Sequence, residues 1–317
     1  MFASIPGALT PQQTVLLQSE NYYMKEVIKM KTAVIFYFSG TGNTELVACM
    51  LRDTLSKREY VTELIRMEDV LKNKIPLNVS GYDLIGIGSQ VIGFGAPRLV
   101  YEFIKALPKA NGQKTFVFRT AGGVAPVNYN ASKPMMRRLK RKGYDVFYER
   151  IFSISSNWIS KFDDDVIIKL HEATQKKVGL MCDGLVKGEQ RILKTGFMQR
   201  MMMECVMFTT PFFFRMAGKR YAVKDTCTHC GQCVKNCPAG NITMEEERIR
   251  FHSSCSLCMR CIYSCPKNAI YLKSFAFFAV PGGYNIKKIL AQPCAVEVKD
   301  KKPEPRFLKE YLANDAL

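Results

Sequence analysis

Short apolar runs alternate with amphipathic stretches from residue 31 onward. The apolar runs have the length and composition of buried strands and lie at 33–38, 59–65, 84–87, 115–119 and 146–154. The spacing of apolar positions predicts helices between or after them, at 44–57, 97–107, 133–142 and 164–186. Strands that alternate with helices are typical of a parallel sheet with crossover connections. We therefore expect an α/β domain at residues 30–188, a doubly wound parallel sheet with strand order 2-1-3-4-5.

The loop after the first predicted strand has the composition of a phosphate site. It consists of Ser39, Gly40, Thr41, Gly42, Asn43 and Thr44. Glycines let backbone N–H groups point inward, hydroxyls add donors, and the start of a helix favours an anion. No lysine follows the glycines, which argues against a loop for nucleoside triphosphates, and the spacing is not G-x-G-x-x-G. We expect a phosphate group here; a glycine-rich turn without function is the alternative.

Two further loops lie where such a sheet binds its ligands, outside the carboxyl ends of the strands. The loop after the third predicted strand includes Ser89, Gln90, Val91, Ile92, Gly93 and Phe94. The loop after the fourth includes Ala121, Gly122 and Gly123, and its small side chains let backbone N–H groups approach a ligand. We expect both loops to complete the site that begins at the phosphate loop.

Eight cysteines form two identical runs. Cys227, Cys230, Cys233 and Cys237 have the spacing C-x2-C-x2-C-x3-C-P, and Cys255, Cys258, Cys261 and Cys265 repeat it. This spacing holds cubane iron–sulfur clusters, and in two-cluster proteins the fourth cysteine of each run binds the other cluster. We therefore expect one cluster on Cys227, Cys230, Cys233 and Cys265, and the other on Cys255, Cys258, Cys261 and Cys237.

Other roles fit these cysteines less well. A zinc site would need only paired C-x2-C elements and would not use the third and fourth cysteines of each run. A disulfide framework is typical of short secreted chains, and no signal peptide is evident here. No catalytic dyad or triad is evident either, so we expect the chemistry to belong to the cofactors.

The chain of 317 residues is long enough for two domains, and its formal net charge is +18. Basic side chains gather in two places: Lys133, Arg137, Arg138, Lys140, Arg141 and Lys142, and then Lys187, Arg191, Lys194, Arg200, Arg215, Lys219 and Arg220. A positive surface favours an acidic redox partner or an anionic membrane surface, and a solvated helix face is the alternative. We expect no specific nucleic-acid binding, because no nucleic-acid motif accompanies the charge.

The cysteine runs are similar to those of bacterial two-cluster ferredoxins, over residues 221–275. The sheet pattern and phosphate loop resemble flavodoxins. As a whole, about residues 31–280 resemble the flavodoxin–ferredoxin fusion proteins found mainly in anaerobic bacteria and archaea. This resemblance implies a flavodoxin-like FMN-binding domain, followed by a small α+β ferredoxin domain with two [4Fe-4S] clusters. It places the FMN phosphate on residues 39–44, the flavin ring against residues 89–94 with Phe94 stacked on it, and the pyrimidine edge at residues 121–123.

The function implied is an electron relay between FMN and the clusters, to or from a redox partner protein in the cytoplasm. The alternative is an FMN-dependent reductase of a small molecule, such as a quinone or an unsaturated compound, with the clusters as electron input. A docking subunit with no redox role of its own is a third hypothesis.

The remaining segments carry fewer signals. We expect residues 1–29 to form a disordered N-terminal extension. Residues 189–220 are rich in methionine and aromatic residues, and we expect them to be a linker whose apolar stripe packs one domain on the other. Residues 276–317 form a tail, with a short helix near 284–291.

Overall fold

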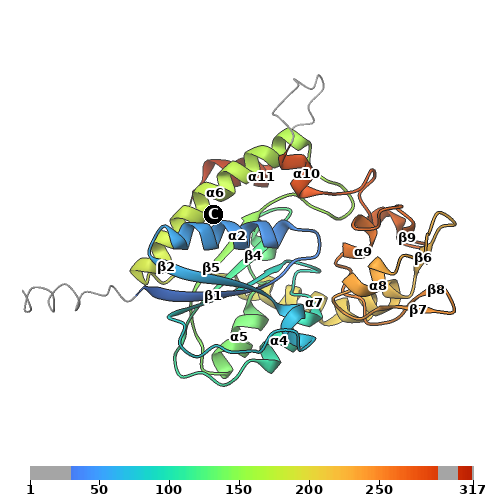
Figure 1. The fold of residues 1–317 in the computed structure, drawn as a ribbon. Coiled ribbons are helices and arrows are strands. Elements are labelled where there is room, and N and C mark those ends of the chain that lie inside the picture. The colour runs from blue at the N-terminus through green and yellow to red at the C-terminus, as the bar shows by residue number, and fades with distance from the viewer. Residues whose placement is uncertain (1–29, 292–305, 316–317) are drawn as a thin grey trace, which may run out of the picture.

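The computed structural model describes residues 30–291 and 306–315. The expected N-terminal extension, residues 1–29, lies outside the described residues, and so does part of the tail. The first domain, here called the sheet domain, contains a five-stranded parallel sheet with the order β2-β1-β3-β4-β5 (Figure 1). This order confirms the doubly wound sheet that the sequence predicts. The strands are β1 (Lys31–Phe38), β2 (Tyr60–Arg66), β3 (Leu84–Gln90), β4 (Lys114–Ala121) and β5 (Asp145–Ser153).

Helices cover both faces of the sheet. The long helix α6 packs beside α2 on one face, while α3, α4 and α5 cover the other. The sequence missed α3, a five-residue helix directly after β2. The bounds are α2 (Asn43–Ser56), α3 (Met67–Leu71), α4 (Arg98–Ala106), α5 (Lys133–Arg141) and α6 (Asp164–Lys187), with a 3-10 turn η1 (Pro126–Asn128).

Strand β1 shows why the predicted strands are apolar without alternation. Its odd-numbered side chains at 33–37 enter the core under α2 and α6, and its even-numbered side chains at 34–38 enter the core under α3, α4 and α5. All six side chains are buried. A strand covered on both faces is expected to be a continuous apolar run.

The second domain, here called the cysteine domain, is a small α+β unit at the carboxyl ends of the sheet strands (Figure 1). It contains two antiparallel strand pairs, β6 with β9 and β7 with β8. A short helix contains the third cysteine of each run, Cys233 in α8 and Cys261 in α9. The elements are β6 (Tyr221–Val223), α8 (Gln232–Asn236), β7 (Ile242–Glu245), β8 (Arg248–Phe251), α9 (Arg260–Tyr263) and β9 (Ile270–Leu272).

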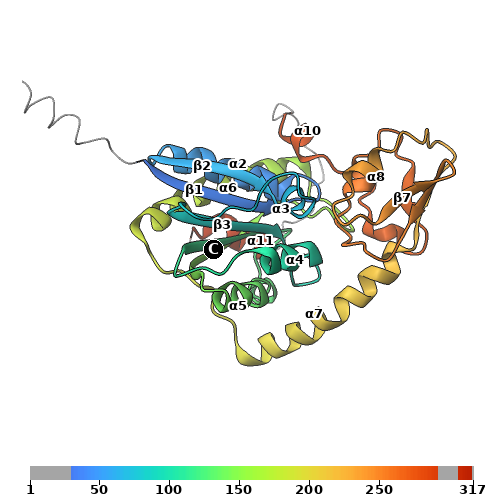
Figure 2. The ribbon, with the colours of Figure 1, turned by 60° about the horizontal axis from the view of Figure 1, so that its bottom comes forward.

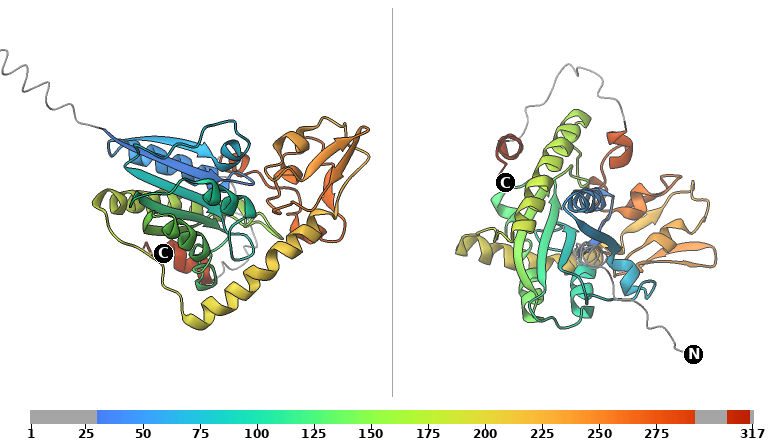
Figure 3. Two further views of the ribbon diagram at one scale, coloured as in Figure 1. Left: turned by 90° about the horizontal axis from the view of Figure 1, so that it is seen from below. Right: turned by 60° about the vertical axis from the view of Figure 1, so that its left-hand side comes forward.

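One long helix, α7 (Phe197–Gly218), joins the two domains and continues through Pro211. Figure 2 shows it running along the outside of the molecule, from near α5 to the cysteine domain, and Figure 3 shows the same course from below. Of the methionines and phenylalanines of α7, which the sequence predicts to pack one domain on the other, only Met203 and Phe214 are buried. In the described residues, no helix is both long enough and apolar enough to cross a membrane.

The tail returns to the sheet domain. Its first part forms η2 (Ala276–Phe278) and α10 (Ile286–Leu290), which packs against α6 beside the N-terminus of α2. Its last helix, α11 (Arg306–Ala313), packs on α6 and β5 through the buried side chains of Leu308 and Tyr311. The described tail helices α10 and α11 are therefore part of the sheet domain's outer layer.

Candidate functional site

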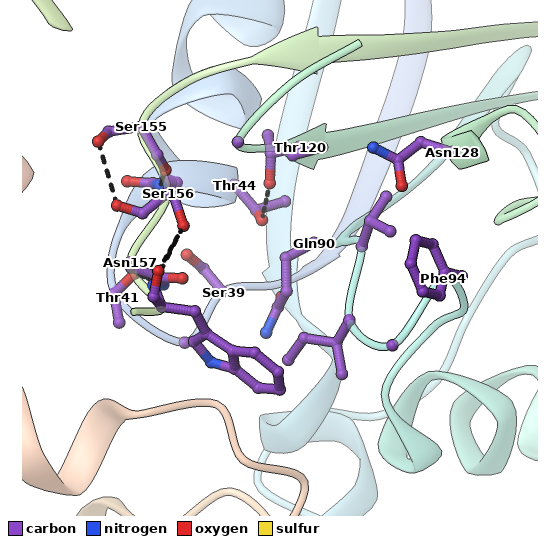
Figure 4. Close-up of a pocket in the computed structure, with 18 residues that line it drawn as sticks. Ser39, Thr41, Thr44, Gln90, Phe94, Thr120, Asn128, Ser155, Ser156 and Asn157 are labelled. Atoms are coloured by element: carbon purple, nitrogen blue, oxygen red, sulfur yellow. Dashed lines mark hydrogen bonds between the residues drawn. The ribbon is translucent and has the colours of Figure 1, made fainter. Parts of the chain in front are cut away.

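An open cavity of about 290 Å³ lies at the carboxyl ends of β1, β3, β4 and β5 (Figure 4). Most residues predicted from the three loops line it. The exceptions are Gly42, Ser89 and Gly123. A fourth loop, after β5, also lines the cavity through Ser155, Ser156, Asn157 and Trp158. This loop has no glycines and so gives no composition signal in the sequence, although its position after a predicted strand would have indicated it.

The phosphate loop is closed by its own polar groups. Gly42 adopts φ 99° at the N-cap of α2, a conformation that favours glycine, and its N–H donates to Ser39 Oγ at 3.1 Å. The hydroxyls of Thr44 and Thr120 are hydrogen-bonded at 2.8 Å, which ties this loop to the end of β4. The first N–H groups of a helix have no partner within it, so the turn presents donors to an anion.

Asn43 lines the cavity, but both polar atoms of its side chain form hydrogen bonds within the protein. Its Nδ2 donates to the carbonyl oxygen of Ser155 at 2.9 Å, and its Oδ1 accepts from the hydroxyl of Tyr284 at 2.7 Å. Tyr284 is buried, and burial raises its pKa above the usual value of a tyrosine. The tail thus fixes the start of α2, a role that the sequence did not indicate.

The loop after β3 is held in a tight turn. Ile92 and Gly95 exchange backbone hydrogen bonds of 3.0 and 2.9 Å around Gly93 and Phe94, which have φ 51° and 58°. Positive φ at both central residues is typical of a type I′ turn, and it is costly for a phenylalanine. This turn holds the Phe94 ring at the rim of the cavity (Figure 4). Gln90 points into the cavity, and its buried Oε1 has no hydrogen-bond partner.

A buried arginine supports this loop from below. Arg119 on β4 has no exposed surface and donates to the carbonyl oxygens of Ser89, Gln90, Gly95 and Ala131, at 2.6–3.1 Å. Burial lowers the pKa of Arg119 to about 10, so the guanidinium stays charged at neutral pH. Arg119 was not predicted as a functional residue, because a single basic residue in a strand sequence does not indicate which carbonyl groups will surround its side chain.

The cysteines lie around two separate cavities of the cysteine domain. Cys227, Cys230, Cys233 and Cys265 line one. Cys237, Cys255, Cys258 and Cys261 line the other. Each cavity therefore combines three cysteines of one run with the fourth cysteine of the other run. We call them the distal and the proximal cavity, by their distance from the sheet domain.

The backbone around the cysteines repeats as closely as the sequence does. His229 and Leu257, at equivalent positions of the two runs, have φ 52° and 48°, and the next equivalent pair, Gly231 and Met259, has φ 67° and 60°. The N–H of His229 donates to Cys227 Sγ at 3.4 Å, and that of Leu257 donates to Cys255 Sγ at 3.3 Å. Such left-handed turns direct N–H groups inward, where they stabilise sulfur ligands that carry negative charge.

The fourth cysteines show the same repeat. Cys237 Sγ accepts from the N–H of Asn241 at 3.2 Å, and Cys265 Sγ accepts from that of Ala269 at 3.3 Å. In the proximal cavity, burial raises the pKa of the Cys261 thiol well above its usual value, and the neighbouring thiols raise it further. Sulfur ligands crowded in this way are stabilised when a metal centre replaces their protons.

The proximal cavity and the sheet-domain cavity share a wall. A Cβ atom at Gly40 would collide with the carbonyl oxygen of Cys258, so only glycine allows the phosphate loop this close. Arg260 donates to the carbonyl oxygen of Ser39 at 2.5 Å and forms a 2.6 Å ion pair with Glu68 on α3. By contrast, Cys230 of the distal cavity is exposed to solvent.

Residues 226–269 match the family model of the 4Fe-4S dicluster domain. The match includes all eight cysteines of the two runs, so the cysteine domain is an iron–sulfur domain of the 4Fe-4S type. No curated protein matches the chain in sequence.

Solved structures similar to the chain include three flavodoxins. One, a short-chain flavodoxin associated with a non-canonical PDU bacterial microcompartment, is 16% identical, with a TM-score of 0.37 over 50% of this chain and 99% of that chain. Oxidised flavodoxin 2 from Bacillus cereus is 18% identical, with a TM-score of 0.36 over 50% and 99%. Two-electron reduced Megasphaera elsdenii flavodoxin is 25% identical, with a TM-score of 0.32 over 38% and 85%.

Proposed function

We propose that this protein relays electrons between FMN, bound in the sheet domain, and two [4Fe-4S] clusters in the cysteine domain, to or from a redox partner protein. The observation that carries the proposal is the shared wall between the two candidate sites, at Gly40 and Cys258. Electron carriers that are fixed in one chain do not depend on collision for transfer. When bound, FMN exchanges one or two electrons and each cluster exchanges one.

The residues of the sheet-domain cavity fit FMN. The N-terminal turn of α2, with the hydroxyls of Ser39 and Thr41, supplies donors for a phosphate group. The orphaned Oε1 of Gln90 offers an acceptor inside the cavity, which suits the polar edge of a flavin ring. Phe94 and Trp158 provide two aromatic side chains in the lining. The sequence predicts Phe94 as the aromatic neighbour of the flavin ring, and the structure adds Trp158 as a second aromatic residue in the lining.

The cysteine cavities fit cubane clusters. Each brings four thiols together, and backbone N–H groups already donate to four of the eight sulfurs. Cys237, Cys255, Cys258 and Cys261 would hold the cluster beside the flavin. Cys227, Cys230, Cys233 and Cys265 would hold the cluster that faces solvent and therefore the redox partner. With a net charge of +18, the chain favours an acidic partner.

Anaerobic purification followed by iron, sulfide and flavin analysis tests the proposal. We expect about eight irons and one FMN per chain. Partial chemical reduction should then leave electrons distributed between the flavin absorbance and the cluster absorbance. A chain that binds clusters but no flavin, after reconstitution with excess FMN, would contradict the relay.

A second cavity supports a second candidate function, the reduction of a small molecule. It measures about 250 Å³ and lies between the loop after β3, α7 and the loop before Cys255. Ile92 and Gly93 line both this cavity and the sheet-domain cavity, and Ser256 lines both it and the proximal cavity. Its walls are largely apolar, with Met207 and Phe214 from α7. A quinone or an unsaturated compound would suit such walls.

Turnover with an added naphthoquinone distinguishes the two functions. With a reductant in continuous supply, and its direct reaction with the quinone subtracted, the protein should reduce the quinone repeatedly if this cavity is a substrate site. Ala96→Trp, which fills the cavity, should then abolish turnover while flavin and iron content stay unchanged. If turnover is the same in the variant, the cavity has no role as a substrate site and the relay alone remains.

A further inference from the structure

One face of α7 is apolar and turned away from the rest of the molecule. At about 100° per residue, its exposed large side chains fall within an arc of about 140°. Each of them is between 42% and 87% exposed, and Phe208 is the most exposed. This outer face consists of Phe197, Met198, Met201, Met202, Phe208, Phe212 and Met216. Contiguous apolar surface of this extent marks an interaction site.

The opposite face of α7 fixes its orientation. Met203, Phe214 and Ala217 are buried against the two domains. A Cβ atom at Gly93 would lie 2.5 Å from Thr210 Cγ2, so the helix touches the loop after β3 directly. The helix cannot rotate to bury its outer face without losing these contacts. Within the part of the chain that the structure describes, the outer face therefore stays at the surface.

The charges around the outer face are positive. Glu204 is the one acidic residue of α7, and it is paired with Arg137 at 2.8 Å and with Arg200 at 3.0 Å. Exposed cations stand at both ends of the helix: Lys194, Arg200, Arg215, Lys219 and Arg220. Lys273 is a further exposed cation near the C-terminal end of the helix. Its backbone N–H donates to the carbonyl oxygen of Arg220, which places the two residues side by side.

The apolar surface continues beyond the C-terminal end of α7. Phe213 contacts Phe275, with ring centroids 5.3 Å apart, and Phe277 of the same turn is 58% exposed. Aromatic rings and cations therefore lie close together where α7 meets the cysteine domain. Such a combination is typical of side chains that enter the headgroup region of a bilayer.

We propose that the outer face of α7 binds the surface of an anionic lipid membrane, with the helix lying in the plane of the interface. Phe208, Phe212 and their apolar neighbours would enter the boundary between headgroups and acyl chains, while the cations at both ends contact anionic headgroups. A second copy of the chain fits the face less well, because two faces with the same positive rim repel each other. Docking on a membrane would hold the loop after β3, on the inner side of α7, close to lipid-soluble or membrane-bound redox partners.

Sedimentation with lipid vesicles tests the proposal on the full chain, loaded with its cofactors under anaerobic conditions. We expect binding to vesicles of phosphatidylcholine mixed with phosphatidylglycerol that is at least about tenfold tighter than to phosphatidylcholine alone. Phe208→Ser combined with Phe212→Ser should weaken binding by at least about tenfold, since it removes two rings from the bilayer. Arg215→Glu with Lys219→Glu should remove most of the preference for the anionic vesicles.

Val61→Ser is the matched control, because Val61 is 49% exposed on the edge strand β2, and it should bind vesicles as the unchanged protein does. All variants alter exposed side chains, so their cofactor absorbance should be unchanged. Failure of the unchanged protein to bind anionic vesicles, or full binding by the double serine variant, would overturn the proposal. A dimer in ultracentrifugation that the double serine variant dissolves, without vesicle binding, would assign the face to a second copy.

Discussion

Where the two domains meet, the indole Nε1 of Trp158 donates a hydrogen bond of 3.2 Å to the carbonyl oxygen of Leu257. Trp158 lines the sheet-domain cavity, and Leu257 lies between two cysteines of the proximal cavity. The indole also packs against Phe278 and Phe214, with centroids 5.0 and 6.0 Å away. A single side chain therefore contacts both candidate cofactor sites.

Trp158 is the one tryptophan of the chain, so its emission reports on the cavity directly. We expect titration of flavin-depleted protein with FMN to quench this emission with one equivalent. Binding measured by FMN fluorescence should saturate at the same point. If FMN binds and the tryptophan emission stays constant, the flavin does not occupy the cavity that Trp158 lines.

Trp158→Phe should slow electron exchange between flavin and clusters. The variant keeps an aromatic ring but loses the hydrogen bond to Leu257, which contributes on the order of 1 kcal/mol to the contact between domains. Rapid-mixing spectroscopy of the two chromophores measures the exchange. Tyr144→Phe is the control, because it removes a ring hydroxyl that donates to the carbonyl oxygen of Pro108, just before β5 and away from both candidate sites. Equal rates in the Trp158 variant and the unchanged protein would refute a coupling role.

The two cysteine cavities should differ in their effect on the flavin. Cys258→Ala should damage the proximal cluster and shift the flavin spectrum or potential, because Cys258 contacts the phosphate loop at Gly40. Cys230→Ala should damage the distal cluster, leave about four irons in place and leave the flavin unchanged. Electron paramagnetic resonance of the reduced variants identifies the remaining cluster. The reverse pattern would exchange the proximal and distal assignments.

Much of this arrangement is readable from the sequence, for definite physical reasons. Strands covered on both faces, such as β1, are continuous apolar runs, and a glycine-rich turn such as 39–44 stands out from its surroundings. The cysteine spacing repeats because the backbone turns around the two cavities repeat, with positive φ at His229 and Leu257. Features that depend on neighbouring residues, such as a buried strand or a tight turn, can therefore be recognised in a short stretch of the sequence.

Features that depend on distant contacts cannot be recognised in this way. Tyr284 donates a hydrogen bond to Asn43, which lies 241 positions earlier in the chain. Arg119 donates to carbonyl oxygens of three other segments. The sequence predicts that the apolar stripe of α7 packs one domain on the other, since a methionine-rich stripe usually packs. When a helix has apolar residues on two faces, the sequence pattern does not indicate which face packs on the rest of the protein. Here one face packs on the domains and the other is exposed.

Gly40→Ala should weaken the contact between the domains. The added methyl group would collide with the carbonyl oxygen of Cys258, and backbone cannot give way as a flexible side chain does. We expect a loss of more than about 1 kcal/mol in the free energy of unfolding, together with lower retention of both cofactors. Gly179→Ala is the matched control, because nothing lies within 4 Å of its added Cβ on α6, and it should be neutral or stabilising. Thermal unfolding with cofactor analysis measures both; equal behaviour of the two variants would contradict the close contact at Gly40.

Arg119→Met should disturb the loop after β3 without touching the phosphate turn. The substitution keeps an apolar stem but leaves carbonyl oxygens of Gln90 and Gly95 without their donor, and each buried orphan costs about 1–3 kcal/mol. We expect a lower unfolding temperature and an FMN affinity reduced by about tenfold or more. Arg98→Met is the control, because Arg98 is exposed on α4 and its ion pair with Glu102 contributes little. Inorganic phosphate competing for the phosphate turn should bind both variants equally. If Arg119→Met lowers stability but leaves FMN affinity unchanged, Arg119 supports the sheet and does not position the cofactor loop.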